Sequence, residues 1–180
     1  PEEVLTGVQC GVDKDFSIPR ARRASGGIIT AVLSCGLLID WLEIFKGESL
    51  QLVYALLYQV VAAFHESGLT LHAVAYDNAC KLLHVMRAKR DDNPPVTRII
   101  ALLRCLLDAF HRGNHTWCLE HLPEVDPERP ENAHIFEDVN TEACEQLNNW
   151  INGRTLPALE FPPGQFLIYW WSLFDFRNAH

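Results

Sequence analysis

Short apolar runs alternate with helix-forming segments along this chain of 180 residues. A chain with this alternation has to bury strands and helices against one another. Three strand-like runs precede the first long helix, and strands and helices alternate after it. We therefore expect one α/β domain over residues 1–180, a mixed sheet of about five strands flanked by helices, with the first three strands antiparallel. The strand-like runs are Val4–Cys10, Gly27–Leu33, Leu37–Ile44 and Leu69–Tyr76, and Cys105–Phe110 could be a strand or the end of a helix.

Apolar periodicity and capping residues predict the helices between these runs. In the first helix, apolar side chains recur at intervals of four, and Asn78 is a good cap for the second. We expect the first helix to pack on one face of the sheet, with Leu69–Tyr76 beside the first strand. The predicted helices are Leu50–Phe64, Ala79–Ala88, Val96–Arg104, Glu142–Ile151 and Phe166–Phe176.

The composition is that of a globular domain with an acidic surface. Hydrophobic residues make up 48% of the chain, and 15 Lys and Arg against 23 Asp and Glu give a net charge of −8. This composition excludes disordered and collagen-like chains, and the acidic balance argues against nonspecific coating of DNA or anionic membranes. A local basic patch can still contact DNA, and Arg20, Arg22 and Arg23 are the candidates.

Six widely spaced cysteines form no tight disulfide framework. We interpret most of them as reduced, buried residues of an intracellular protein that is not secreted. The sequence has no signal peptide and no run of about 18 apolar residues, so we expect no membrane partner. Because the chain starts at Pro1 without a Met, we expect it to be a fragment of a longer protein.

Asp77 follows the predicted strand Leu69–Tyr76 and precedes a helix. Ligands of open α/β sheets bind at the carboxyl ends of the strands, where a carboxylate can hold Mg²⁺. The alternative is that Asp77 shares the capping of the helix with Asn78.

Four potential zinc ligands lie close together in the segment that follows Asp108. They are His111, His115, Cys118 and His121, and the Cys-x2-His spacing is typical of zinc ligands. Two alternatives remain. The histidines could stabilise a turn around a buried Cys118, or Asp108 or His111 could act in an active site.

Glu142 and Glu145 are three residues apart, on one face of a predicted helix. A glutamate on a helix can complete a metal site that a strand-end aspartate begins. The alternative is a helix whose first turn carries solvated acids, which the helix dipole favours.

Seven short segments follow one another in a specific order along almost the whole chain. They are Lys14-Asp15 with Arg23-x2-Gly26-Gly27-Ile28; Cys35-Gly36; Lys46-Gly47-Glu48-Ser49; Tyr76-Asp77-x2-Cys80; Asp108-x-Phe110-His111-x3-His115-x2-Cys118; Asn140-Thr141-Glu142-Ala143-Cys144-Glu145-Gln146; and Arg177-Asn178. In order and spacing, the chain resembles the catalytic domain of KDZ (Kyakuja-Dileera-Zisupton) transposases, which are eukaryotic DDE transposases with an RNase H-like core.

The resemblance implies metal-dependent cleavage and transfer of DNA strands, in which three carboxylates hold two Mg²⁺ or Mn²⁺ ions. It implies that Asp77 is the second aspartate and Glu142 the glutamate, with Glu145 as the competing position. His111 and His115 match the family's His-x3-His segment beside the active site.

The first aspartate is expected near residues 6–13, but Val4–Cys10 contains no Asp. Asp13 is the candidate, and Asp15 also lies just beyond this run. The resemblance also implies a nuclear protein that binds transposon ends, mostly through modules outside this chain, and it leaves room for a homo-oligomer. Two alternatives stay open: an inactive relative that serves as a binding or assembly module, and a small structural zinc protein.

Overall fold

The computed structural model describes residues 27–45, 48–137, 139–158 and 161–179. The predicted strand Val4–Cys10, the candidate Asp13 and the three arginines of the basic patch lie outside these residues. The described part is 57% helical. Its elements are β1 Ile28–Val32, β2 Leu38–Glu43, α1 Leu50–Glu66, β3 Ala73–Ala75, α2 Ala79–Ala88, α3 Val96–Leu102, β4 Arg104–Leu106, α4 Thr116–His121, α5 Pro130–Phe136, α6 Ala143–Ala158 and α7 Pro163–Ala179, with short 3-10 turns at Arg112–Asn114 and Pro123–Val125.

The prediction of an RNase H-like sheet of about five strands is wrong. The described residues form two sheets of two strands each, β1 with β2 and β3 with β4. Most of the apolar run Leu69–Tyr76 is not strand, and Leu69 itself is exposed. Helices rather than further strands cover the hairpin, and Leu71, Val74 and Tyr76 of this run are partly buried against the helices.

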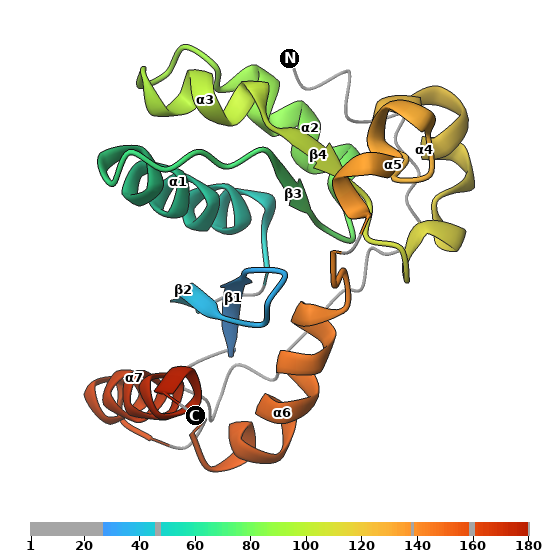
Figure 1. Cartoon of the computed structure of the whole chain (residues 1–180). Coiled ribbons are helices and arrows are strands. Elements are labelled where there is room, and N and C mark those ends of the chain that lie inside the picture. Colours follow the sequence, from blue (N-terminus) through green and yellow to red (C-terminus); the bar gives the residue numbers. More distant parts are fainter. Residues whose placement is uncertain (1–26, 46–47, 138, 159–160, 180) are drawn as a thin grey trace.

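The predicted antiparallel pairing of Gly27–Leu33 with Leu37–Ile44 is confirmed, and the two strands form a β-hairpin. β1 and β2 pair antiparallel, with Thr30 opposite Trp41, and Gly36 closes the turn at a φ of +87° that favours glycine. Side chains alternate between the two faces of such a hairpin. Ile28 packs towards α6 and α7, whereas Ile29 packs towards α1, so the hairpin lies between two hydrophobic clusters (Figure 1).

The first hydrophobic cluster is built by α1, α2 and α3 around the β3–β4 pair. The Ser49 hydroxyl accepts a hydrogen bond from the Leu52 backbone N–H and caps α1 as expected from an N-cap serine. Leu82, Met86 and Ile100 are completely buried between the helices. This packing holds the start of α2 against β4, where the candidate site lies.

The second cluster joins α6 and α7 to the hairpin. Trp170 and Phe166 of α7 are buried there against Leu147 of α6. At the end of α7, the Asn178 side chain accepts a hydrogen bond from the Leu38 N–H (3.2 Å) and donates one to the Leu38 carbonyl (2.8 Å). The side chain thus satisfies the backbone of β2 in the way that a neighbouring strand would.

The short β3–β4 pair is parallel, with Val74 opposite Cys105. The pairing extends to Tyr76, whose N–H donates to the Leu106 carbonyl. Because parallel strands end at the same edge, the residues that follow β3 and β4 are brought together there. These residues include Asp77 and Asp108.

Candidate metal site

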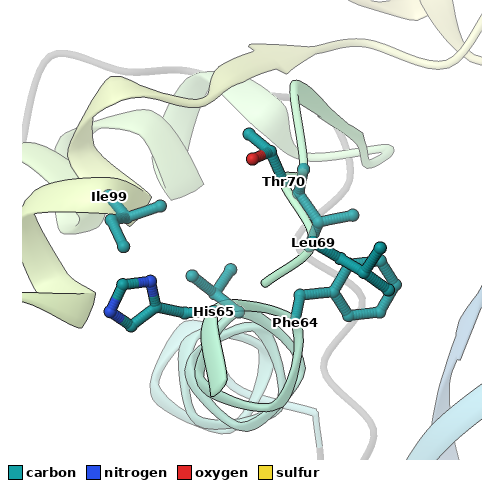
Figure 2. A pocket seen from close by; sticks show the side chains of 7 residues that line it. Phe64, His65, Leu69, Thr70 and Ile99 are labelled. Atoms are coloured by element: carbon teal, nitrogen blue, oxygen red, sulfur yellow. The ribbon is translucent and has the colours of Figure 1, made fainter. Parts of the chain in front are cut away.

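One cavity of the described part lies away from the strand ends. It has a volume of about 180 Å³ and lies between α1, α3 and the segment that precedes β3 (Figure 2). None of the candidate site residues predicted from the sequence lines it. Its lining is mostly apolar: Val61, Phe64, His65, Leu69, Thr70, Leu71 and Ile99.

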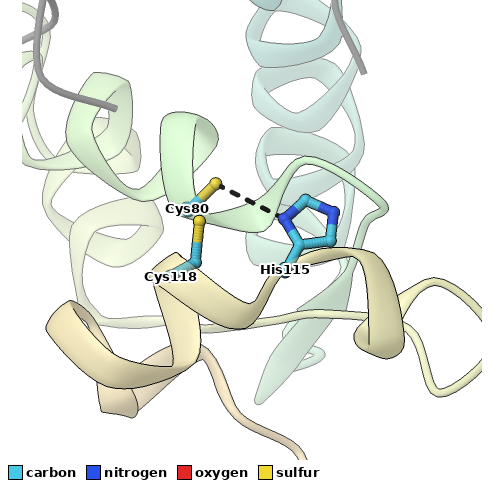
Figure 3. A group of neighbouring side chains, drawn as sticks. All are labelled: Cys80, His115 and Cys118. Carbon is cyan, nitrogen blue, oxygen red and sulfur yellow. Dashed lines mark hydrogen bonds between the residues drawn. The ribbon is translucent and has the colours of Figure 1, made fainter. Parts of the chain in front are cut away.

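Cys80, His115 and Cys118 form a compact cluster that could hold a metal ion (Figure 3). One ligand atom from each residue, a sulfur or a ring nitrogen, lies within 4.8 Å of the other two. The three residues are 0%, 2% and 1% exposed. Among the described residues, no other group of three His, Cys, Asp or Glu meets this criterion.

Two helix starts bring the three residues together. Cys80 is the second residue of α2, and the Cys105 thiol packs beneath that turn, donating to the Ala79 carbonyl at 3.5 Å. His115 immediately precedes α4, and its carbonyl accepts the Leu119 N–H, so it lies one helical turn from Cys118. The first hydrophobic cluster, which includes Cys80 and Cys118, therefore holds the starts of α2 and α4 close together.

The electrostatics of the cluster favour a neutral imidazole. Burial lowers the pKa of His115 from its ordinary value of 6.5, and the charges of His111 and Lys81 act in the same direction. The negative charges of Asp77 and Asp108 oppose this shift without reversing it. Because a metal-bound histidine has to be neutral, His115 is ready for coordination at pH 7.

Cys80 and Cys118 are not in disulfide bonds. Cys80 Sγ lies 4.0 Å from His115 Nδ1 (Figure 3), and the Cys80 thiol donates to Asn78 Oδ1 at 3.5 Å. Asn78 therefore contacts this thiol, and its side chain does not cap α2 as the sequence predicted. Two cysteine sulfurs and an imidazole are soft or borderline ligands, and this set suits Zn²⁺ better than Mg²⁺.

Asp77 lies beside the cluster with one oxygen buried. Oδ1 has no hydrogen-bond donor among the described residues, although it is shielded from solvent. The preceding residue is held firmly, because the Tyr76 hydroxyl donates to Glu48 Oε1 at 2.8 Å. Burial, then the negative charge of Glu48, raises the pKa of Tyr76, so this phenol stays protonated and keeps its hydrogen bond.

Asp108 orients His111. Its Oδ2 lies 2.7 Å from His111 Nδ1, and its Oδ1 accepts the His111 backbone N–H at 2.9 Å. A carboxylate on Nδ1 fixes the ring and leaves Nε2 as its free functional nitrogen.

The structure brings together two of the four predicted zinc ligands, His115 and Cys118. His111 is turned towards Asp108, and His121 stacks on Trp117 with its Nδ1 at 2.9 Å from the Trp117 carbonyl. The sequence did not identify Cys80 as a candidate ligand, because Cys80 lies 35 residues before His115 and was interpreted as a small buried residue. The signal that could have revealed it is the repeated x2 spacing, Asp77-x2-Cys80 and His115-x2-Cys118.

The first turn of α6 lies near the end of β4. The pKa of the Cys144 thiol is raised mainly by desolvation, and also by the negative charges of Glu145 and Asp108. Asp108 is therefore close enough to act on this turn. Glu142 is exposed and Glu145 is half-buried. With Asp13 outside the described residues, the three-carboxylate site remains a prediction.

Comparison of the chain with protein-family models, curated proteins and solved structures finds no match. None of the helices in the described ranges combines the length and the apolar character needed to cross a lipid bilayer.

Proposed function

We propose that this domain binds one structural zinc ion through Cys80, His115 and Cys118. The observation that carries the proposal is the convergence of two buried thiols and a buried imidazole within 4.8 Å, from segments far apart in the sequence. Buried cysteine and histidine ligands are typical of structural zinc sites, in which the metal ties separate segments together. Here the ion would join the start of α2 to the start of α4.

Metal analysis tests the proposal. Protein purified with a reductant and without chelator should retain about one zinc per chain through dialysis, because structural zinc is bound tightly. Cys118→Ala should lose it. Cys105→Ala is the matched control, since burial raises the pKa of the Cys105 thiol to about 12 and keeps it protonated. Wild type that binds no zinc, or Cys118→Ala that binds it normally, would contradict the proposal.

A second candidate function is cleavage and transfer of DNA strands, which the resemblance to KDZ transposases implies. The observation in its favour is the position of Asp77 and Asp108 after adjacent parallel strands, with the start of α6 near Asp108. Glu142 immediately precedes α6, and Glu145 lies in its first turn. Carboxylates at such an edge suit Mg²⁺ or Mn²⁺. The ions would activate a water or a 3′-hydroxyl to attack phosphorus and would stabilise the departing 3′ oxygen.

Plasmid nicking in Mn²⁺ tests this second function. If the chain is active, wild type should convert supercoiled plasmid to nicked product, and Asp77→Asn should abolish nicking because it removes the charge that binds a hard cation. Asp91→Asn is the control, since Asp91 is an exposed carboxylate that pairs with Arg98. A folded wild type that does not nick DNA would favour a binding or assembly module instead.

A further inference from the structure

The metal cluster has two ligands on one segment and one on the other. His115 and Cys118 are separated by two residues, and this spacing lets both ligands of a pair reach one ion at a helix start. The segment that carries Cys80 has Asp77 at the same spacing, two residues before it. Asp77-x2-Cys80 therefore has the ligand spacing of His115-x2-Cys118, and two such pairs supply the four ligands of a tetrahedral zinc site.

A nearby cation would stabilise the buried carboxylate oxygen of Asp77. Its Oδ1 is shielded from solvent and receives no hydrogen bond from the described residues. Leaving a carboxylate oxygen buried without a hydrogen-bond partner costs free energy, and a bound cation would remove that cost. Asp77 is also close enough to His115 for its charge to act on that ring. A cation held by His115 would thus compensate the buried oxygen.

We propose that Asp77, whose carboxylate lies outside the group of ligand atoms within 4.8 Å, turns towards the bound zinc and becomes its fourth ligand, which completes an Asp-Cys-His-Cys site. The inference rests on the zinc binding proposed above and adds to it the residue that closes the coordination sphere. A closed sphere of four protein ligands is the arrangement of structural zinc sites, whereas an open fourth position is typical of catalytic ones.

The charges around the site are consistent with this ligand set. Two thiolates and one carboxylate on Zn²⁺ leave a formal charge of −1. Lys81 follows Cys80 directly, and its positive charge acts on His115. It can therefore offset the excess negative charge. A carboxylate has two oxygens, so a zinc bond from Oδ1 leaves Oδ2 for another cation.

Zinc affinity and the absorption spectrum of the cobalt-loaded protein test the fourth ligand. Asp77→Ala should raise the Kd for zinc by more than about 100-fold, because loss of groups that only support ligands already costs 10–100-fold. Asp77→Cys should restore tight binding and add a third thiolate-to-cobalt charge-transfer contribution. Asp108→Asn is the control, since Asp108 is the other strand-end carboxylate that acts on His115 and its side-chain bonds go to His111. The Kd of Asp108→Asn for zinc should stay within about tenfold of the wild-type Kd, which is the smallest loss of affinity typical when a group that supports a metal ligand is removed.

The outcomes distinguish failure of Asp77 as the fourth ligand from failure of the proposed zinc binding. If wild type binds zinc and Cys118→Ala does not, while Asp77→Ala binds as tightly as wild type, another ligand closes the site and the inference is overturned. An Asp77→Cys protein whose cobalt spectrum shows only two thiolates would overturn it as well. If wild type binds no zinc at all, the zinc function itself fails. Circular dichroism of each variant identifies loss of binding that follows from unfolding.

Discussion

Removal of zinc should lower the free energy of unfolding by about 4 kcal/mol when wild type is compared in chelator and in free zinc at roughly a thousand times its Kd. An ion that binds only the folded chain stabilises it by mass action, and here it would tie α2 to α4. The measurement is urea unfolding in the presence of reductant, followed by circular dichroism. Cys118→Ala should unfold at the same urea concentration with zinc and with chelator. A wild type that is equally stable under both conditions would contradict a structural role for the ion.

A fall in pH should lower the free energy of unfolding, as the chelator does. Protons compete with zinc for the thiolates and for the imidazole, so the stabilisation by zinc should shrink as the pH falls below neutrality. In zinc-free protein, the lowered pKa of His115 contributes stability that is complete above its ordinary value of 6.5. That contribution is lost as the pH falls from 6.5 through the lowered pKa, because the unfolded chain binds the proton first.

Trp170→Ala should destabilise the protein by about 3 kcal/mol, at the low end of the range for truncating a buried tryptophan. Trp170 is 0% exposed, and its ring stacks on Phe174 with a centroid distance of 5.2 Å. The low end is expected because the indole N–H is buried and has no acceptor among the described residues. Removing that unsatisfied donor offsets part of the lost packing.

The adjacent Trp171 is the matched control, because it has the same side chain on the same helix but is 69% exposed. Trp171→Ala should change the free energy of unfolding by no more than about 0.5 kcal/mol. Urea unfolding followed by far-ultraviolet circular dichroism compares the two variants without relying on tryptophan fluorescence. Equal effects at the two positions would show that α7 does not pack as described. Trp170→Ala should leave zinc affinity unchanged, since the cluster around α7 does not include the metal site.

Local patterns were sufficient for most individual elements. The hairpin around Cys35-Gly36 and the helix from Leu50 follow from short-range alternation, a glycine turn and a serine cap, and all of these act within a few residues. The arrangement of the strands could not be predicted in this way. The apolar run Leu69–Tyr76 indicates that its side chains tend to be buried. The pattern does not indicate whether a strand or a helix covers them. Within the described residues, only Ala73–Ala75 of this run are strand, paired with β4, and the Tyr76 N–H continues the pairing.

The candidate metal site was likewise predictable only in part. His115 and Cys118 are recognisable in the sequence because both lie in one helical turn, where the spacing of residues determines which side chains meet. Cys80 joins them only because the packing of α2 against β4 brings the start of that helix to the start of α4. Asp77 acquires its buried oxygen from the same packing. Spacing along the chain therefore identifies ligands that share a segment, whereas the burial of apolar surface between distant elements decides which segments come together.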